Sequence, residues 1–148
     1  MSNPILSQLI LFNQRYKELD DLYCNYAKAN GLSDTVFWII YSVWDSAEPY
    51  AQKEICDTWS YSKQTVNSAL KNLEKQGLVT LEPVPTNRKN KQIILTEEGK
   101  ALAKRILIPL LEAERNSFAS LTDTERDELL RLLQKHIVAI RAEMNKIL

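Results

Sequence analysis

Hydrogen-bonding side chains and cations share one face of the stretch Ser62 to Val79, SKQTVNSALKNLEKQGLV. Ser62 predicts a helix N-cap, and Gly77 predicts the helix end, because a left-handed glycine commonly closes a helix. Amides and hydroxyls that reach base edges, flanked by cations that reach phosphates, suit a helix in the major groove of DNA. The alternative is an ordinary amphipathic surface helix. The polar face carries Lys63, Gln64, Thr65, Asn67, Ser68, Lys71, Asn72 and Lys75, opposite the apolar Val66, Leu70 and Leu73.

The charge distribution favours the first interpretation of this stretch. The chain of 148 residues has 19 cations and 19 acids, so its net charge is zero. Residues 1–48 are acidic overall and residues 97–148 are balanced, whereas residues 62–92 hold six cations against two acids. The positive charge therefore surrounds the polar helix, as an electrostatic footprint for nucleic acid would.

Composition bounds the class of protein. An apolar content of 45% with 26% charged residues is typical of a globular chain that is mostly helical, since it has only three glycines. No apolar run is long enough to span a membrane, and we expect a cytoplasmic protein with two reduced, buried cysteines, Cys24 and Cys56. We find no phosphate-binding loop or nucleophile elbow, and with one histidine we expect no enzyme, no cofactor and no metal site.

The segment before the polar helix predicts three more helices. The first spans about 5–30, where Ile5, Leu9, Phe12, Tyr16, Leu19, Tyr23 and Tyr26 follow the alternating spacing of four and three residues of a coiled-coil seam. A second, at about 34–46 with Ser33 or Asp34 as its cap, is apolar nearly all round and should be buried. A short third helix, about 51–59, followed by a tight connection into the polar helix, makes a helix-turn-helix pattern.

After Gly77 the periodicity changes from that of a helix to that of strands. Residues 79–82 and 92–95 predict two short strands, and the hairpin between them is basic, with Arg88, Lys89 and Lys91. A basic hairpin directly after a candidate recognition helix is a wing, placed to touch the phosphate backbone or the minor groove. The alternative is an ordinary charged hairpin tip.

The last third predicts two helices. Thr96 caps the first, and Thr122 with Glu125 forms a capping box for the second. In the second, Leu130, Leu133, Ile137, Ile140, Met144 and Ile147 form another apolar seam. Long seamed helices at both ends of the chain predict a homodimer, which would present two polar helices to successive major grooves. The alternative is that the two seams close an intramolecular bundle.

With these residues in place, the chain resembles the multiple antibiotic resistance regulator (MarR) family of winged-helix transcription factors. The helix SKQTVNSALKNLEKQGLV and the wing ending in NRKNKQIILTEEGK carry the resemblance, which covers nearly the whole chain. It implies a mainly α fold with a small two-stranded β wing: a winged helix-turn-helix lobe at 31–100 between dimerisation helices at 1–30 and 101–148. At the wing the family commonly has Asp-Arg-Arg, where this chain has Asn87, Arg88 and Lys89.

The resemblance also implies a function. A homodimer would bind a palindromic operator in double-stranded DNA and regulate transcription, most simply as a repressor. The residues expected at bases and phosphates are Ser62, Lys63, Gln64, Thr65, Asn67, Ser68 and Lys71, with Arg88, Lys89 and Lys91 on the wing. The competing class is a winged-helix protein-interaction module that docks an acidic partner without specific DNA binding.

Family members commonly release DNA when a small aromatic compound binds between the dimer helices and the lobe. The candidate walls of such a site are Tyr16, Tyr23, Trp38, Tyr41 and Trp44, which offer aromatic faces and phenolic hydrogen-bonding groups. The alternative is that these aromatic residues are plain core. Some relatives sense oxidants through cysteine instead, but neither Cys24 nor Cys56 has a cationic neighbour in sequence to lower its thiol pKa.

Overall fold

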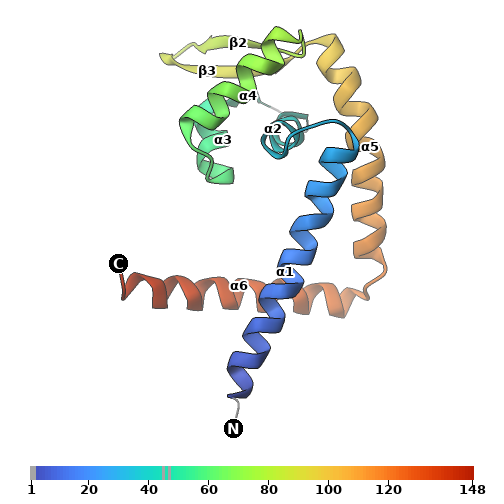
Figure 1. Cartoon of the computed structure of the whole chain (residues 1–148), viewed down its shortest axis with the longest axis vertical. Helices are drawn as coiled ribbons and strands as arrows, with labels where there is room; N and C mark the ends of the chain where they lie inside the picture. Colours follow the sequence, from blue (N-terminus) through green and yellow to red (C-terminus); the bar gives the residue numbers. More distant parts are fainter. Residues whose placement is uncertain (1–2, 45, 47) are drawn as a thin grey trace. The chain divides into compact units, whose positions relative to one another are not determined.

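A computed structural model describes residues 3–44, 46 and 48–148, with the side chain of Arg88 outside the description. By internal packing the chain divides into two units, Met1–Leu107 and Ile108–Leu148, each treated by itself below. The division into segments 1–30, 31–100 and 101–148 concerned roles in binding and dimerisation, and it stays a prediction. The elements in chain order (Figure 1) are α1 (Pro4–Ala29), α2 (Asp34–Trp44), β1 (Tyr50–Ala51), α3 (Gln52–Trp59), α4 (Lys63–Lys75), β2 (Val79–Val84), β3 (Asn87–Leu95), α5 (Glu97–Ala119) and α6 (Asp123–Asn145).

The helix ends form where local sequence predicted them. Gly31 takes φ 72° after α1, and the Leu32 N–H donates to the Ala27 carbonyl, which closes the helix with a left-handed residue. Of the two candidate caps for α2, Ser33 is the one used, because its hydroxyl accepts from the Val36 N–H at 3.3 Å. This helix ends at Trp44, and Asp45, inside the predicted 34–46 span, lies outside the described residues.

The first unit has a closed hydrophobic core. The apolar helix α2 lies at its centre, with Phe37 and Ile39 fully buried. It packs against α1, the helix-turn-helix pair α3 and α4, and the strand β3. The surrounding elements contribute side chains without exposed surface or nearly so: Ile55 from α3, Val66, Leu70 and Leu73 from α4, Val79 and Ile93 from the strands, and Ala103, Ile106 and Leu107 from α5. The lobe therefore buries its apolar faces within its own chain.

The sheet has three strands in the order β1-β3-β2, all antiparallel. Strands β2 and β3 are the predicted wing, whereas β1 is an addition that the sequence analysis missed. It pairs Tyr50 with Ile93 and Ala51 with Gln92, so Ala51, predicted to open the short helix, lies in a strand and serves as the α3 N-cap position. A two-residue strand has no room for an alternating pattern, so only pairing reveals it.

Gly99 lets the start of α5 approach the end of α4. A Cβ added at Gly99 would meet the Leu78 carbonyl oxygen at 1.9 Å, so any side chain there would clash with backbone. Thr96 fastens the same junction, because its hydroxyl donates to the Gly77 carbonyl at 2.6 Å and accepts from the Gly99 N–H at 3.0 Å. This contact positions the C-terminal end of α4 and the base of the wing.

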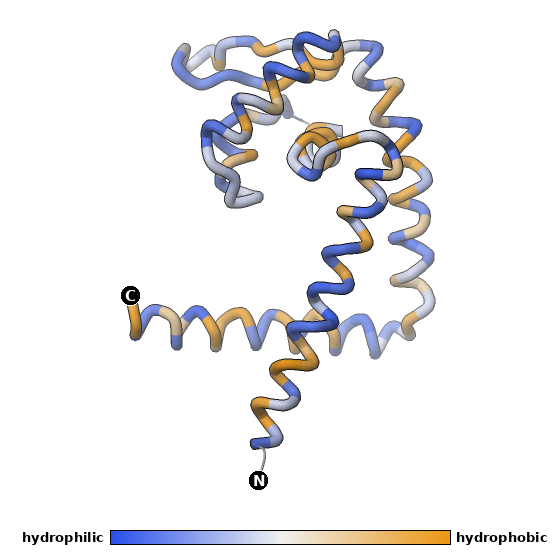
Figure 2. The backbone as a smooth tube through the Cα atoms, in the orientation of Figure 1, coloured by the Kyte–Doolittle hydropathy of each residue, from blue (hydrophilic) through white to orange (hydrophobic). Residues whose placement is uncertain are grey.

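The terminal helices differ from the lobe in burial. Residues 4–20 of α1 are all exposed, and α6 has no buried residue within the described chain. Figure 2 shows hydrophobic positions recurring along both helices. The predicted capping box opens α6, where the Glu125 N–H donates to the Thr122 hydroxyl at 3.1 Å and the Thr122 N–H to the Glu125 carboxylate at 3.0 Å. The second seam therefore lies on a well-formed helix with its apolar side chains uncovered.

Candidate nucleic-acid interface

The predicted polar helix is α4, and both of its ends are capped as predicted. The Ser62 hydroxyl accepts from the Thr65 N–H at 3.1 Å and also pairs with the Thr65 hydroxyl at 2.8 Å. At the other end Gly77 takes φ 73°, and the Leu78 N–H donates to the Leu73 carbonyl. With Val66, Leu70 and Leu73 buried, the opposite face is directed to solvent.

The turn before α4 is tied to α2 by two hydrogen bonds from aromatic side chains. Tyr61 donates its phenol to Asp34 Oδ2 at 2.8 Å, and Trp59 donates its indole N–H to the Ser42 hydroxyl at 2.7 Å. The Trp59 ring also stacks on Trp38, with centroids 4.3 Å apart. Burial raises the pKa of the Tyr61 phenol, and the bond to Asp34 raises it further, so the phenol stays a donor at neutral pH.

Most of the predicted α4 contacts lie on the exposed face. Lys63, Gln64, Thr65, Ser68 and Lys71 are all exposed. Ser62 is exposed too, but its hydroxyl serves as the helix cap. Asn67 is the exception, because it is half-buried and its side-chain oxygen accepts a hydrogen bond from Gln52 of α3.

The wing presents its lysines next to a tight tip. Val84 pairs with Asn87 across a two-residue turn, after an irregularity at Pro83 and Val84. The Asn87 side chain accepts from the Lys89 N–H at 3.2 Å and so orders the start of β3. Lys89 and Lys91 are exposed, and Arg88 has its backbone in β3 while its side chain lies outside the described part of the chain.

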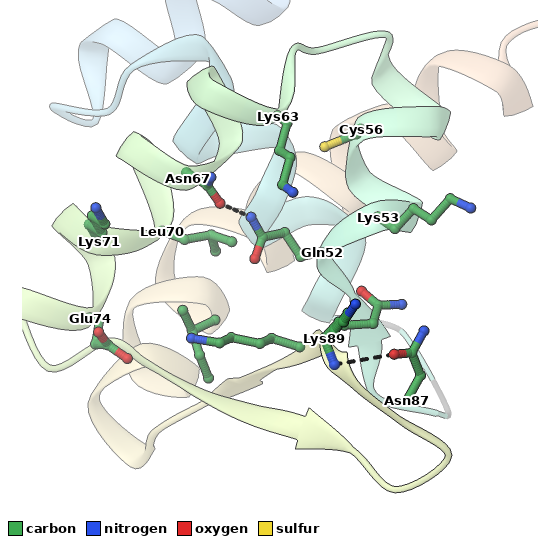
Figure 3. Close-up of a pocket in the computed structure, with 13 residues that line it drawn as sticks. Gln52, Lys53, Cys56, Lys63, Asn67, Leu70, Lys71, Glu74, Asn87 and Lys89 are labelled. Atoms are coloured by element: carbon green, nitrogen blue, oxygen red, sulfur yellow. Dashed lines mark hydrogen bonds between the residues drawn. The ribbon is translucent and has the colours of Figure 1, made fainter.

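A groove of about 680 Å³ lies between α3, α4 and the wing (Figure 3). Of the described residues that line it, five are lysines (Lys53, Lys63, Lys71, Lys89 and Lys91) and one, Glu74, is an acid. Leu70 and Leu81 add apolar lining. Four cations predicted separately on the helix and the wing thus line one concave, positive surface that suits a phosphodiester backbone.

Five polar residues of this groove were not among the predicted contacts: Gln52 and Lys53 on α3, Glu74 on α4, and Asn87 and Asn90 on β3. The sequence assigned α3 to the helix-turn-helix pattern without a contact residue on it. The available indication was Lys53, an exposed lysine in the first turn of α3 that lines the groove with α4. Which side chains meet across α3, α4 and β3 depends on tertiary packing.

The structure brings together three of the five candidate effector residues. The Trp38 ring lies 5.3 Å from Tyr23 and 5.2 Å from Tyr41, centroid to centroid. Tyr16 is 62% exposed and stacks on Phe12, about two helical turns before Tyr23. Trp44 is half-buried at the end of α2. Trp59 was not predicted but belongs to the same aromatic cluster. Through Trp59 the cluster contacts the turn before α4.

Neither cysteine is fully buried, so that expectation was wrong. The Cys24 thiol donates to Asp34 Oδ1 at 3.4 Å, and burial, followed by that bond and nearby acids, raises its pKa. This opposes thiolate formation. Cys56 is half-buried and lines the groove between α3, α4 and the wing.

The described residues contain no group of three or more His, Cys, Asp or Glu side chains that could hold a metal ion. Within the same part of the chain, every helix is too short or too polar to cross a membrane.

A helix-turn-helix followed by a two-stranded basic hairpin defines the winged helix class. Consistent with this, a model of the MarR family matches residues 30–89, from the end of α1 to the wing. The HTH-type transcriptional regulator PecS of Dickeya dadantii is 29% identical over 127 residues, which cover 82% of this chain and 74% of PecS.

Solved structures share the fold over most of the chain. NMB1585, a MarR family regulator from Neisseria meningitidis, has a TM-score of 0.81 at 24% identity and covers 95% of this chain and 99% of its own. The S. aureus MepR–DNA complex has a TM-score of 0.71 at 18% identity, over 88% of this chain and 96% of MepR. The chain is thus similar to the MarR family over residues 30–89, and it shares its fold with these solved structures.

Proposed function

We propose that this protein is a transcriptional regulator, most simply a repressor, whose homodimer binds a palindromic site in double-stranded DNA. The observation that carries the proposal is the groove in which lysines of α3, α4 and the wing converge on one surface. Such a surface attracts phosphates, while the exposed amide and hydroxyls of Gln64, Thr65 and Ser68 are available to base edges. PecS, NMB1585 and MepR are named as regulators or as a DNA complex, which supports the same assignment.

The proposal assigns α4 to the major groove and the wing, with Arg88, Lys89 and Lys91, to the backbone or minor groove. It assigns no chemical reaction to the protein. It includes a cytoplasmic address, because the operator DNA would be reached there. The competing proposal, a protein-interaction module, would use the same lysines against an acidic partner and would show no preference among DNA sequences.

The homodimer is part of the proposal because a palindromic operator requires two equivalent lobes. Its support is the uncovered apolar surface of the terminal helices, such as Ile5, 72% exposed on α1, and Leu130, 55% exposed on α6. Monomeric proteins rarely leave large contiguous apolar patches in water, so these helices need a partner surface.

The proposal also includes a small aromatic effector that binds the lobe. Its support is the contact of Trp38 with both Tyr23 and Trp59, since a ligand that separates these rings would also disturb the turn before α4. Quenching of tryptophan fluorescence by phenolic compounds, measured together with release of bound DNA, tests it. A compound that quenches without releasing DNA would argue against coupling.

The test of DNA binding is selection of bound sequences from a random pool, followed by titration of the selected fragment. We expect a two-fold symmetric consensus and a Kd that rises with salt, with a shallow slope per subunit because the basic footprint is small. Lys63→Glu should weaken binding at least about tenfold, because it reverses a charge next to phosphates. Lys104→Glu on α5 is the matched control, since Lys104 is exposed and does not line the groove. Equal effects of the two reversals, or no enriched sequence, would favour the interaction module.

A further inference from the structure

The amides of Gln52 and Asn67 meet in the groove and join α3 to α4. Gln52 Nε2 donates to Asn67 Oδ1, and Figure 3 shows this bond in the groove between Lys63 and the wing. Both side chains are half-buried and line the groove. Asn67 is predicted to contact DNA, and the orientation of its side chain is thus set by a residue of another helix.

This bond determines which end of the Asn67 amide is available to a ligand. An asparagine amide has one acceptor group, Oδ1, and one donor group, Nδ2. A bidentate contact to adenine needs both groups to face the base edge together. Since Gln52 turns Oδ1 toward α3, the amide can offer the groove its Nδ2 donor but cannot face an adenine edge with both groups.

We infer that Gln52 is a positioning residue that orients Asn67 as a hydrogen-bond donor toward an acceptor atom of DNA. This inference rests on the proposed function and extends it to a residue outside the expected contact set. Two kinds of acceptor share this chemistry: a base atom in the major groove, such as guanine O6 or thymine O4, and a phosphate oxygen. Sequence preference distinguishes them, because only a base contact depends on sequence.

Gln52→Glu tests the inference by reversing the polarity of the pair. A glutamate carboxylate only accepts, so it would bond Asn67 Nδ2 and turn Oδ1 toward the DNA. Gln52→Met removes the bond while keeping a similar shape. Asn90→Asp controls for the added charge, since Asn90 lines the same groove on β3. All variants are compared by thermal unfolding, so that loss of fold is separated from loss of binding.

The measurement is the Kd for the selected fragment and for fragments with each base at each half-site position. If the acceptor is guanine O6 or thymine O4, the wild type prefers that base at one position per half-site, and Gln52→Glu shifts the preference toward cytosine or adenine, whose amino groups donate there. If it is a phosphate, Gln52→Glu weakens all sequences alike by about three- to tenfold more than Asn90→Asp does. Either result supports the inference.

The deciding control repeats the Gln52 variants in an Asn67→Ala background. If Gln52 acts through Asn67, Gln52→Met has no effect there, and Gln52→Glu has only the charge effect seen with Asn90→Asp. Unchanged effects of the Gln52 variants in that background would overturn the inference, as would unaltered binding by Gln52→Glu in the wild-type background. Failure of the wild-type protein to bind any DNA would instead refute the proposed function.

Discussion

The lobe and the terminal helices use the same apolar periodicity and differ in what covers it. In the lobe, Ile55 of α3 and Val66 of α4 have no exposed surface. On α6, Leu130 and Leu133 stand at equally regular helical spacing and remain 55% and 41% exposed. A periodic apolar face therefore predicts that something will cover it, and only the packing identifies what does. In the lobe it is the chain itself, whereas the terminal seams need a second surface.

The comparison predicts that core and seam substitutions will differ in how they depend on protein concentration. Phe37→Ala removes a fully buried ring and should lower the free energy of unfolding by about 3–5 kcal/mol at every concentration. Leu130→Ala should have an effect that shrinks as the protein is diluted, because its partner surface would be another copy. Urea unfolding followed by circular dichroism at several concentrations measures both. A concentration-independent loss of stability in Leu130→Ala as large as that in Phe37→Ala would contradict a second copy as the surface that covers Leu130.

A charge placed on the α6 seam should dissociate the dimer without unfolding the lobe. We expect Leu133→Asp to raise the dimer dissociation constant by about a hundredfold, equivalent to about 2.8 kcal/mol. Ala142→Asp is the control, because it adds the same charge on the side of α6 away from the seam. Analytical ultracentrifugation gives the association constants. If the wild type sediments as a monomer, the terminal seams are not covered by a second copy.

The Tyr61–Asp34 hydrogen bond is an intramolecular contact of the lobe, so its effect on stability should not depend on protein concentration. The pKa of the Tyr61 phenol is raised in the folded protein. The protonated phenol therefore stabilises the fold below the ordinary tyrosine pKa of about 10, and this stabilisation is lost as the pH rises above that value. Tyr61→Phe should cost about 0.5–1.5 kcal/mol at neutral pH, independently of concentration.

Ultraviolet absorbance measures the same group directly. Tyr61 should form its phenolate only at a pH above the ordinary tyrosine pKa of about 10, and Tyr61→Phe should remove that late step. Tyr16→Phe, on the exposed part of α1, removes one tyrosine while leaving the turn before α4 intact. If the late step survives Tyr61→Phe, another residue causes it.

The smallest expected effect concerns backbone conformation within the lobe. Ser60 is the described non-glycine residue with a positive φ, at 55°, in the connection between α3 and α4. Ser60→Gly should stabilise the lobe by about 0.5–1 kcal/mol, because glycine adopts this conformation without strain. Gly77→Ala should destabilise the lobe, since Gly77 has φ 73°, which strains a residue with a Cβ. The added Cβ would meet Glu98 at 3.6 Å, an ordinary contact, so the effect would come from the backbone alone. Thermal unfolding compares the two variants.

Local features were predictable from the sequence because neighbouring residues determine them. Ser62 and Thr122 cap their helices through their own hydroxyls, and Gly31 and Gly77 end helices because glycine tolerates a positive φ. The core face of α4 followed from helical spacing for the same reason. The two-residue strand β1 was not predictable, since it exists only through pairing with β3.

By itself, then, the sequence determined the order of elements, the caps, the polar face of α4 and the basic wing, all consequences of short-range chemistry. Tertiary structure alone decided that Gln52 orients Asn67, that Trp59 and Tyr61 tie the turn to α2, and that lysines from α3, α4 and β3 line one groove. The three hydrogen bonds among these contacts join residues that are 15 to 27 positions apart in the chain. Their formation depends on how the apolar faces pack, because packing sets which polar side chains meet.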